Sequence, residues 1–220
     1  MKKNKKNIPK KIILYGGTSQ AKVVKPIIDL YGSKIIAVFD DTKNLKSPFI
    51  NIPIYYGYDS LLKWSNKRNI NNIGFLITIG NPHGKKRIKL HKKLCELGFV
   101  SFTIIHPSAI IDKSAKIEDG CQIMAGSVIM VDVKISKETI VNTNSNIDHE
   151  CIIEEGCEVA PGATLCGKVK LRKYSWICAG ATILPRITIG QNSIVGAGAV
   201  VTKNVEMNKT VVGIPAKIQK

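Results

Sequence analysis

The chain has 220 residues and a formal net charge of +17, from 33 Lys and Arg against 16 Asp and Glu. Hydrophobic residues make up 44% of it, which is enough for a packed core, and no apolar run approaches the roughly 20 residues that a membrane span needs. Because the lysines are dispersed, aromatic residues are only 6% and no nucleic-acid-binding signature occurs, the charge favours small anionic ligands over nucleic acid.

The beginning of the chain, MKKNKKNIPKK, is basic. The apolar run after it, Ile12-Ile13-Leu14, ends at once in Tyr15-Gly16-Gly17. This run is too short for the core of a signal peptide. We therefore expect a cytoplasmic protein.

Residues 11–102 alternate between strand-like and helix-like segments. Apolar runs predict strands at 11–17, 34–41 and 72–80. Helical spacing of the apolar residues predicts helices at 19–32, with Pro26 in the first turns, and at 58–69 and 85–98. The segment 42–57 is expected to be a loop. This βαβαβ alternation predicts a small parallel sheet, about half of a dinucleotide-type fold.

Polar and glycine residues follow each predicted strand. A glycine turn between the first strand and helix suits a phosphate or sugar cradle, or is a plain turn. The two aspartates that end the second strand suit a ribose or base, or cap a loop. The candidate substrate-binding residues are Gly16, Gly17, Thr18, Ser19, Gln20, Asp40, Asp41, Gly80 and Asn81.

From Ile105 onward an aliphatic residue recurs at every sixth position, seventeen times in succession up to Val201. A helix of period 3.6 could not place these residues on one face. A mostly small residue follows four positions after each, and Cys121, Cys151 and Cys157 are among them. The pattern predicts a hexapeptide β-helix, with these cysteines as small inward residues. No CxxC pair occurs, which excludes a zinc knuckle of that type.

Several motifs together resemble one family over nearly the whole chain. They are YGGTSQAKVV, FDD, NTNSNIDHECIIEEGCEVAPGATLCGKV and VVGIPAK. They resemble the two-domain left-handed β-helix sugar acetyltransferases of bacterial polysaccharide biosynthesis. The resemblance implies an α/β half-Rossmann domain that binds a nucleotide sugar at 1–102, followed by a left-handed parallel β-helix acetyltransferase domain at 103–220.

The resemblance also implies an activity. It implies an acetyl-CoA-dependent N-acetyltransferase that acts on a nucleotide-linked amino sugar, in particular a 4-amino-6-deoxy sugar. Sugar O-acetylation of the sialic-acid type is the alternative. The family usually has Gly-His where this chain has Ser19-Gln20, which leaves the sugar contacts open.

The family's coil is triangular, so residues eighteen apart should stack at three corners. A bare corner, nearly without side chains, comprises 125–126, 143–144, 161–162, 179–180 and 197–198. A histidine corner comprises 131–132, 149–150, 167–168, 185–186 and 203–204. The third corner, at 137–138, 155–156, 173–174 and 191–192, is expected to be solvated.

An isolated histidine is more often a surface residue than a functional one, but His149 falls on a corner directly below Gly167. The resemblance implies that His149 is the general base, which suits a side chain that titrates near neutrality. Glu150 is expected to orient the imidazole, and the Gly167 N–H to stabilise the oxyanion. Asn142 is a further catalytic candidate that holds the substrate amine. Asp148 is expected to point elsewhere, because it lies in a strand segment.

Related enzymes are trimers with the coenzyme between adjacent β-helices, so a homotrimer is expected here. The candidate residues for acetyl-CoA are Gly167, Ala179, Gly180, Pro185, Ala197, Gly198 and Lys203, with Lys168, Arg186 and Lys217 as further candidates for its phosphates. A metal-dependent β-helix hydratase resembling γ-carbonic anhydrase would need several histidines, and the β-helix has only His106 and His149. No metal is therefore expected, and a non-catalytic solenoid stays open. His106 is expected to be structural, and His83 and His91 to be solvated.

Overall fold

The computed structural model describes residues 8–219, so most of the basic start and Lys220 lie outside the described residues. The chain divides into two compact units. The first comprises the residues up to Ile79 together with Lys89–Ile104, and the second comprises Gly80–Ile88 and the residues from Ile105 onward. The short segment 80–88, which the sequence pattern places in the first domain, therefore packs with the second unit.

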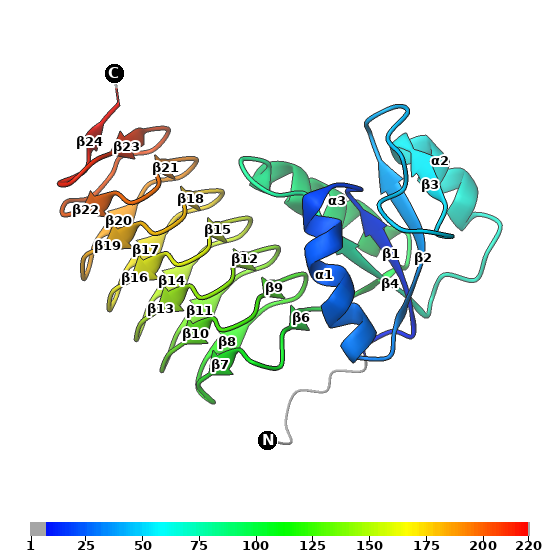
Figure 1. Ribbon diagram of the computed structural model, residues 1–220, viewed down its shortest axis with the longest axis horizontal. Helices are drawn as coiled ribbons and strands as arrows, with labels where there is room; N and C mark the ends of the chain where they lie inside the picture. Colours follow the sequence, from blue (N-terminus) through cyan, green and yellow to red (C-terminus); the bar gives the residue numbers. More distant parts are fainter. Residues whose placement is uncertain (1–7, 220) are drawn as a thin grey trace. The chain divides into compact units, whose positions relative to one another are not determined.

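The first unit contains a five-stranded parallel sheet in the order β3-β2-β1-β4-β5 (Figure 1). Its strands are β1 Lys11–Tyr15, β2 Lys34–Asp40, β3 Ile54–Tyr56, β4 Ile73–Ile77 and β5 Val100–Ser101. The helices are α1 Ser19–Leu30, α2 Gly57–Ser65 and α3 Gly84–Glu96. The βαβαβ alternation is thus confirmed. Strand β3 lies in a segment expected to be a loop, because three residues are too few for a periodic pattern, and Pro26 lies in the interior of α1 rather than in its first turns.

The core of this sheet is apolar on the side that α2 and α3 cover. Phe39 and Phe75 of the sheet pack with Trp64 of α2 and Leu94 of α3. His91, expected to be solvated, is instead 7% exposed and meets the Phe75 ring edge-on, with the ring centroids 5.4 Å apart. It lies on the inner face of α3, one helical turn before Leu94, and the many lysines of this helix hide that position in the sequence.

The second unit is a β-helix of short parallel strands in three sheets. The first sheet has six strands: β7 Ile110–Ile111, β10 Val128–Ile129, β13 Asn146–Ile147, β16 Thr164–Leu165, β19 Thr182–Ile183 and β22 Val200–Val201. The second has five: β8 Lys116–Ile117, β11 Lys134–Ile135, β14 Ile152–Ile153, β17 Lys170–Leu171 and β20 Thr188–Ile189. The third has eight: β6 Ile104–Ile105, β9 Gln122–Ile123, β12 Ile140–Val141, β15 Glu158–Val159, β18 Trp176–Ile177, β21 Ile194–Val195, β23 Thr210–Val212 and β24 Lys217–Ile218.

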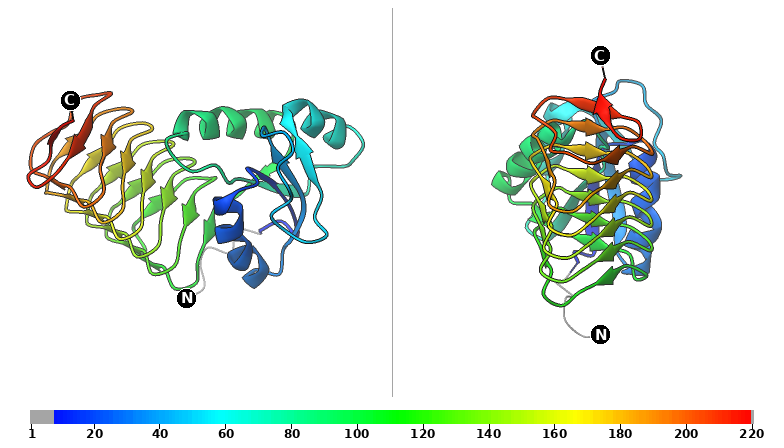
Figure 2. Two further views of the ribbon diagram at one scale, coloured as in Figure 1. Left: turned by 45° about the horizontal axis from the view of Figure 1, so that its top comes forward. Right: turned by 90° about the vertical axis from the view of Figure 1, so that its left-hand side faces the viewer.

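Successive coils of the β-helix stack with a register of eighteen residues (Figure 2). In the first sheet, for example, Val128 pairs with Asn146, which pairs with Thr164. The sixth-position aliphatic residues point inward, and those from Ile123 to Val201 are at most 2% exposed. Each such side chain contributes about 1.5–3 kcal/mol on full burial. Cys121, Cys151 and Cys157 are fully buried among them, as the repeat predicts.

Segment 80–88 is fastened to the β-helix by the fully buried Arg87. Its guanidinium donates to three backbone carbonyls, those of Glu138 (3.1 Å), Gly156 (2.8 Å) and Cys157 (3.1 Å). It also donates to the side-chain oxygen of Asn81 at 3.1 Å. A buried guanidinium needs such partners for its five N–H donors. Arg87 therefore holds this segment through polar contacts rather than through an apolar interface.

Arg87→Met should lower stability, because it removes the hydrogen bonds that the guanidinium donates to three buried carbonyls. We expect a loss of about 3–5 kcal/mol and a melting temperature at least about 6 °C lower in a calorimetric scan. Lys85→Met is the matched control, since Lys85 is exposed on the same helix. Equal melting temperatures of the two variants would contradict the anchoring role of Arg87.

Candidate active site

His149 lies just after β13, at the corner where the first sheet leads into the second. Its side chain is 45% exposed, and its Nδ1 is 3.0 Å from Glu150 Oε2. The hydrogen bond with His149, and after it the nearby Lys168 ammonium, lower the pKa of Glu150 below its ordinary value. A carboxylate can only accept, so Nδ1 carries the proton of this hydrogen bond. The neutral ring then keeps its lone pair on Nε2.

Gly167 packs against the imidazole from the next coil. A Cβ at this position would overlap Nε2 and Cε1 of His149. The backbone N–H groups on either side are used, since Cys166 donates to Ile183 O and Lys168 to His149 O. Within residues 8–219 the Gly167 N–H itself has no acceptor. The backbone of the buried Gly167 thus packs against the imidazole, and its N–H remains available to an acceptor outside the described residues.

Asp148 does not point away from His149, contrary to expectation. Its Oδ1 accepts the backbone N–H of His149 at 2.8 Å, and its Oδ2 lies 4.0 Å from Nε2. The residue before a corner can cap the first N–H of that corner through a short polar side chain. Asn142 does the same one corner earlier, where its Oδ1 accepts the Thr143 N–H at 2.9 Å. Strand β13 ends at Ile147, so Asp148 lies in the turn and not in the strand, and the hydrophobic pattern says nothing of this turn chemistry.

Asn142 is not brought to His149 within one chain. It follows β12 at the bare corner, whereas His149 follows β13 at the histidine corner. No hydrogen bond or ion pair joins the two among residues 8–219. The predicted catalytic set therefore divides into a cluster of His149, Glu150 and Gly167 and a distant Asn142.

The bare corner is open from Gly162 onward. Ala179, Gly180, Ala197 and Gly198 are exposed. A Cβ at Gly162, Gly180 or Gly198 would meet no described atom within 4 Å. These glycines have φ near +65°, a conformation that glycine adopts without steric cost. A ligand could approach the backbone closely here. Pro185 and Lys203 are exposed at the histidine corner, above Gly167 in the stack.

In the first unit the glycine turn after β1 is tightly bonded. Gly16 N–H donates to Phe39 O at 2.7 Å, and Gly17 N–H donates to Asp40 Oδ2 at 2.6 Å. Asp40 is 9% exposed, and its Oδ1 accepts the Thr42 N–H at 2.8 Å. The Asp40 carboxylate thus caps the turn, and these two glycine N–H groups are engaged. The positions left for an anion, Thr18 to Gln20, begin α1, which has no side-chain cap and no acidic residue in its first turn.

Two residues of this edge were missed in the sequence. The Tyr15 hydroxyl donates to Asp41 Oδ1 at 2.6 Å, and burial together with this contact raises the Tyr15 pKa above its usual value. The Thr78 hydroxyl donates to Gly16 O at 2.6 Å. Both lie at strand ends, which is a weak signal by itself. Gly80 and Asn81 belong to the second unit, where the Asn81 N–H donates to Glu158 Oε2 at 3.0 Å.

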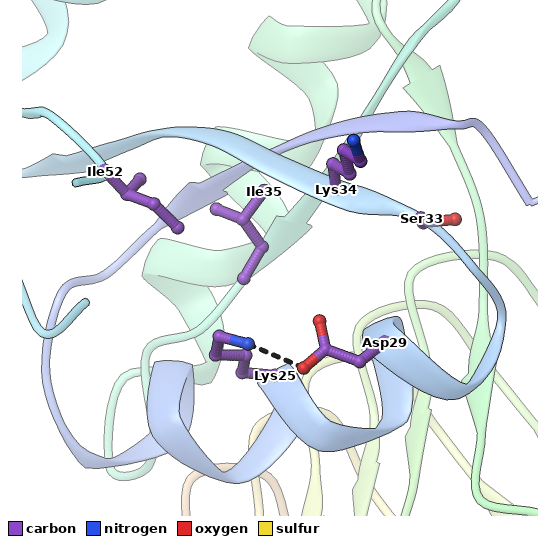
Figure 3. Close-up of a pocket in the computed structure, with 6 residues that line it drawn as sticks. All are labelled: Lys25, Asp29, Ser33, Lys34, Ile35 and Ile52. Carbon is purple, nitrogen blue, oxygen red and sulfur yellow. Dashed lines mark hydrogen bonds and ion pairs between the residues drawn. The ribbon is translucent and has the colours of Figure 1, made fainter. Parts of the chain in front are cut away.

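A surface pocket of about 220 Å³ lies elsewhere in the first unit (Figure 3). Its wall includes Lys25 and Asp29, which form an ion pair at 2.6 Å, and Lys34 at the start of β2. It is at the other end of that strand from Asp40 and takes in none of the predicted site residues.

Within residues 8–219, no group of three His, Cys, Asp or Glu side chains is placed to hold a metal ion. In the same range, none of the helices is long and apolar enough to cross a membrane.

The fold and the histidine corner define a class. The chain is a half-Rossmann domain followed by a left-handed parallel β-helix of hexapeptide repeats, as predicted. Residues 11–94 match the PglD N-terminal domain, and residues 168–203 match the bacterial transferase hexapeptide (six repeats). The chain thus has the architecture of a hexapeptide-repeat sugar N-acetyltransferase, and the predicted resemblance is confirmed.

Individual relatives agree with this class. UDP-N-acetylbacillosamine N-acetyltransferase of Bacillus subtilis is 33% identical over 117 residues, which are 53% of this chain and 52% of the relative. The match thus spans about half the length of that curated relative. A mutant of perosamine N-acetyltransferase from Caulobacter crescentus, solved with CoA and GDP-perosamine, has a TM-score of 0.86 at 28% identity, over 95% of this chain and 96% of that one. The acetyltransferase domain of PglB from Neisseria gonorrhoeae, solved with acetyl coenzyme A, has a TM-score of 0.84 at 25% identity, over 96% and 100%.

Gly167→Ala should displace the His149 ring, because the added methyl group overlaps it. The φ of Gly167 is outside the left-handed region, so alanine brings no backbone strain. With [13Cε1]-labelled histidine, we expect the NMR signal of His149 to shift while the other three histidine signals stay in place. Gly80→Ala is the control, since a Cβ there meets no described atom within 4 Å. An unmoved His149 signal in Gly167→Ala would refute the packing described here.

Proposed function

We propose that this protein is an acetyl-CoA-dependent N-acetyltransferase that acts on the amino group of a nucleotide-linked amino sugar. The observation that carries the proposal is the packing of the His149 imidazole, bonded at Nδ1 to Glu150, against the backbone of Gly167, whose N–H has no acceptor within residues 8–219. The relatives support it, because two of them are named as N-acetyltransferases, of UDP-N-acetylbacillosamine and of perosamine, and the third is an acetyltransferase domain solved with acetyl coenzyme A.

His149 acts as the general base. Its Nε2 takes a proton from the attacking amine as the new C–N bond forms. Glu150 fixes the tautomer through Nδ1 and stabilises the imidazolium that results. No acyl-enzyme is needed, since a thiolate is a good leaving group. The buried Cys151 and Cys157 fit no nucleophilic role, because burial raises the pKa of each thiol to about 11.

Gly167 stabilises the negative charge of the transition state. Its N–H donates to the thioester carbonyl oxygen as negative charge develops there. A donor of this kind typically contributes about 10²–10³ in rate. The side chain must be absent for this backbone to pack against the imidazole, which explains a glycine at this coil.

The first unit is proposed to bind the nucleotide sugar. The uncapped start of α1, from Thr18 to Gln20, suits its phosphates. Asp41, held by Tyr15, presents a carboxylate at the adjacent strand end to a ribose or base hydroxyl or N–H. Asp40 supports the turn from inside. The nucleotide is not specified by these contacts, and the sugar is proposed to be a 4-amino-6-deoxy sugar from the resemblance and the perosamine relative.

We propose that the enzyme is a homotrimer in which the bare corner of one copy faces the histidine corner of the next. One chain keeps Asn142 apart from His149, and its bare corner is open. The apolar side chains of Met130, Val131 and Leu184, exposed by 42%, 42% and 37%, flank the histidine corner. Clustered exposed apolar groups beside a polar site are typical of an interface. In this arrangement Asn142, Ala179–Gly180 and Ala197–Gly198 of a second copy complete the site.

His149→Ala should lower kcat by at least about 10² while both substrates still bind, since the imidazole acts on a proton and not on the scaffold. The assay follows thiol release from acetyl-CoA with a panel of nucleotide-linked 4-amino sugars. Glu150→Gln should cost less, because a misoriented imidazole remains a base.

His106→Ala is the matched control and should leave kcat unchanged. A His149→Ala variant that turns over near the wild-type rate would exclude the proposed base. Acetylation of 4-hydroxy sugars but not of 4-amino sugars would instead establish the O-acetyltransferase alternative.

A further inference from the structure

Lys168 has a contact that its expected role does not explain. The sequence suggests it as a ligand for the coenzyme phosphates. Its Nζ instead lies 3.4 Å from Glu150 Oε2, the same oxygen that bonds His149 Nδ1. Its backbone N–H donates to His149 O at 2.9 Å. Lys168 is therefore tied to the His149–Glu150 pair through both its main chain and its side chain.

The position of Lys168 is conformationally unfavourable for a lysine. Its φ is +63°, in the left-handed region, where a residue with a Cβ costs about 1–2 kcal/mol more than glycine. The other second residues of the histidine corner, Asp132, Glu150 and Arg186, share this conformation, with φ between +57° and +63°. A left-handed φ is therefore common to this corner, and what distinguishes Lys168 is its ion pair with Glu150.

We propose that Lys168 is a positioning residue for His149: its ammonium group holds the Glu150 carboxylate against the imidazole and offsets its charge. The catalytic role of Lys168 rests on the proposed function, in which His149 is the general base. Without Lys168, the ring would face two carboxylates, Glu150 at Nδ1 and Asp148 at 4.0 Å from Nε2. Two neighbouring negative charges favour the imidazolium, which cannot act as a base.

The other titratable groups near the ring do not supply a positive charge in place of Lys168. Cys151 follows the corner, and Cys166 precedes Gly167 on the next coil. Burial raises the pKa of both thiols, so both are neutral near pH 7. Among the described residues, Lys168 is thus the cation that forms an ion pair with this cluster, through Glu150. Its ammonium group therefore offsets the negative charge that Glu150 places beside the imidazole.

The test is the titration of His149 in the folded protein without substrates. With [13Cε1]-labelled histidine, His149→Ala identifies its signal among four. In Lys168→Met the midpoint of that signal should move to higher pH by about half a unit, the size of one unit charge at a few ångströms near solvent. Lys168→Gln should do the same, and Lys168→Arg should restore the wild-type midpoint. Lys170→Met, an exposed lysine two residues further on, is the control and should have no effect.

Kinetics separate the two roles. If Lys168 is a positioning residue, the Lys168→Met change shifts the acidic limb of the kcat/KM pH profile to higher pH. The shift is equal for acetyl-CoA and for S-acetyl-pantetheine, which lacks the nucleotide phosphates. A phosphate ligand would instead raise KM for acetyl-CoA only. An unchanged His149 midpoint in both Lys168→Met and Lys168→Gln would overturn the proposal. Because the midpoint is measured without turnover, a missing acetyltransferase activity would refute the proposed function without changing this result.

Discussion

The stacking of β-helix coils at a register of eighteen residues is the constraint on which the rest of the second unit depends. Parallel pairs such as Val128 with Asn146 and Asn146 with Thr164 satisfy the backbone groups from coil to coil. They also align the inward aliphatic columns, whose burial supplies the driving force. A shift of one residue would turn each column outward, so the hydrophobic pattern fixes the register.

This register also creates the candidate site. It places Gly167 directly against the ring of His149, eighteen residues earlier in the chain, so that the imidazole and a backbone without a side chain meet with no loop between them. The corners are rigid because each second corner residue donates to the coil below, as Glu150 does to Val131 O and Lys168 to His149 O. A preorganised donor of this kind does not need to reorganise during the reaction.

The sequence predicts the structure best where one residue pattern repeats many times. Seventeen repeats of one hexapeptide predict the β-helix and its inward cysteines, and the family's triangular coil then predicts the alignment of His149 with Gly167. Single polar contacts have no period. The turn into which Asp148 folds back, the capping of the glycine turn by Asp40, and the pairing of Lys168 with Glu150 each depend on side-chain rotamers that no spacing encodes. Arg87 and His91 are similar cases, since a basic helix hides which of its cations face inward.

We propose that one active site uses the histidine corner of one copy and the bare corner of another. The direct measurement is subunit complementation, in which His149→Ala is co-assembled with Ala179→Trp, a variant that fills the open corner. Each variant alone should be inactive. In randomly mixed trimers about a quarter of the sites carry neither change, so about a quarter of the wild-type activity should return. Full activity of Ala179→Trp alone, or no recovery in mixed assemblies, would contradict a site shared between copies.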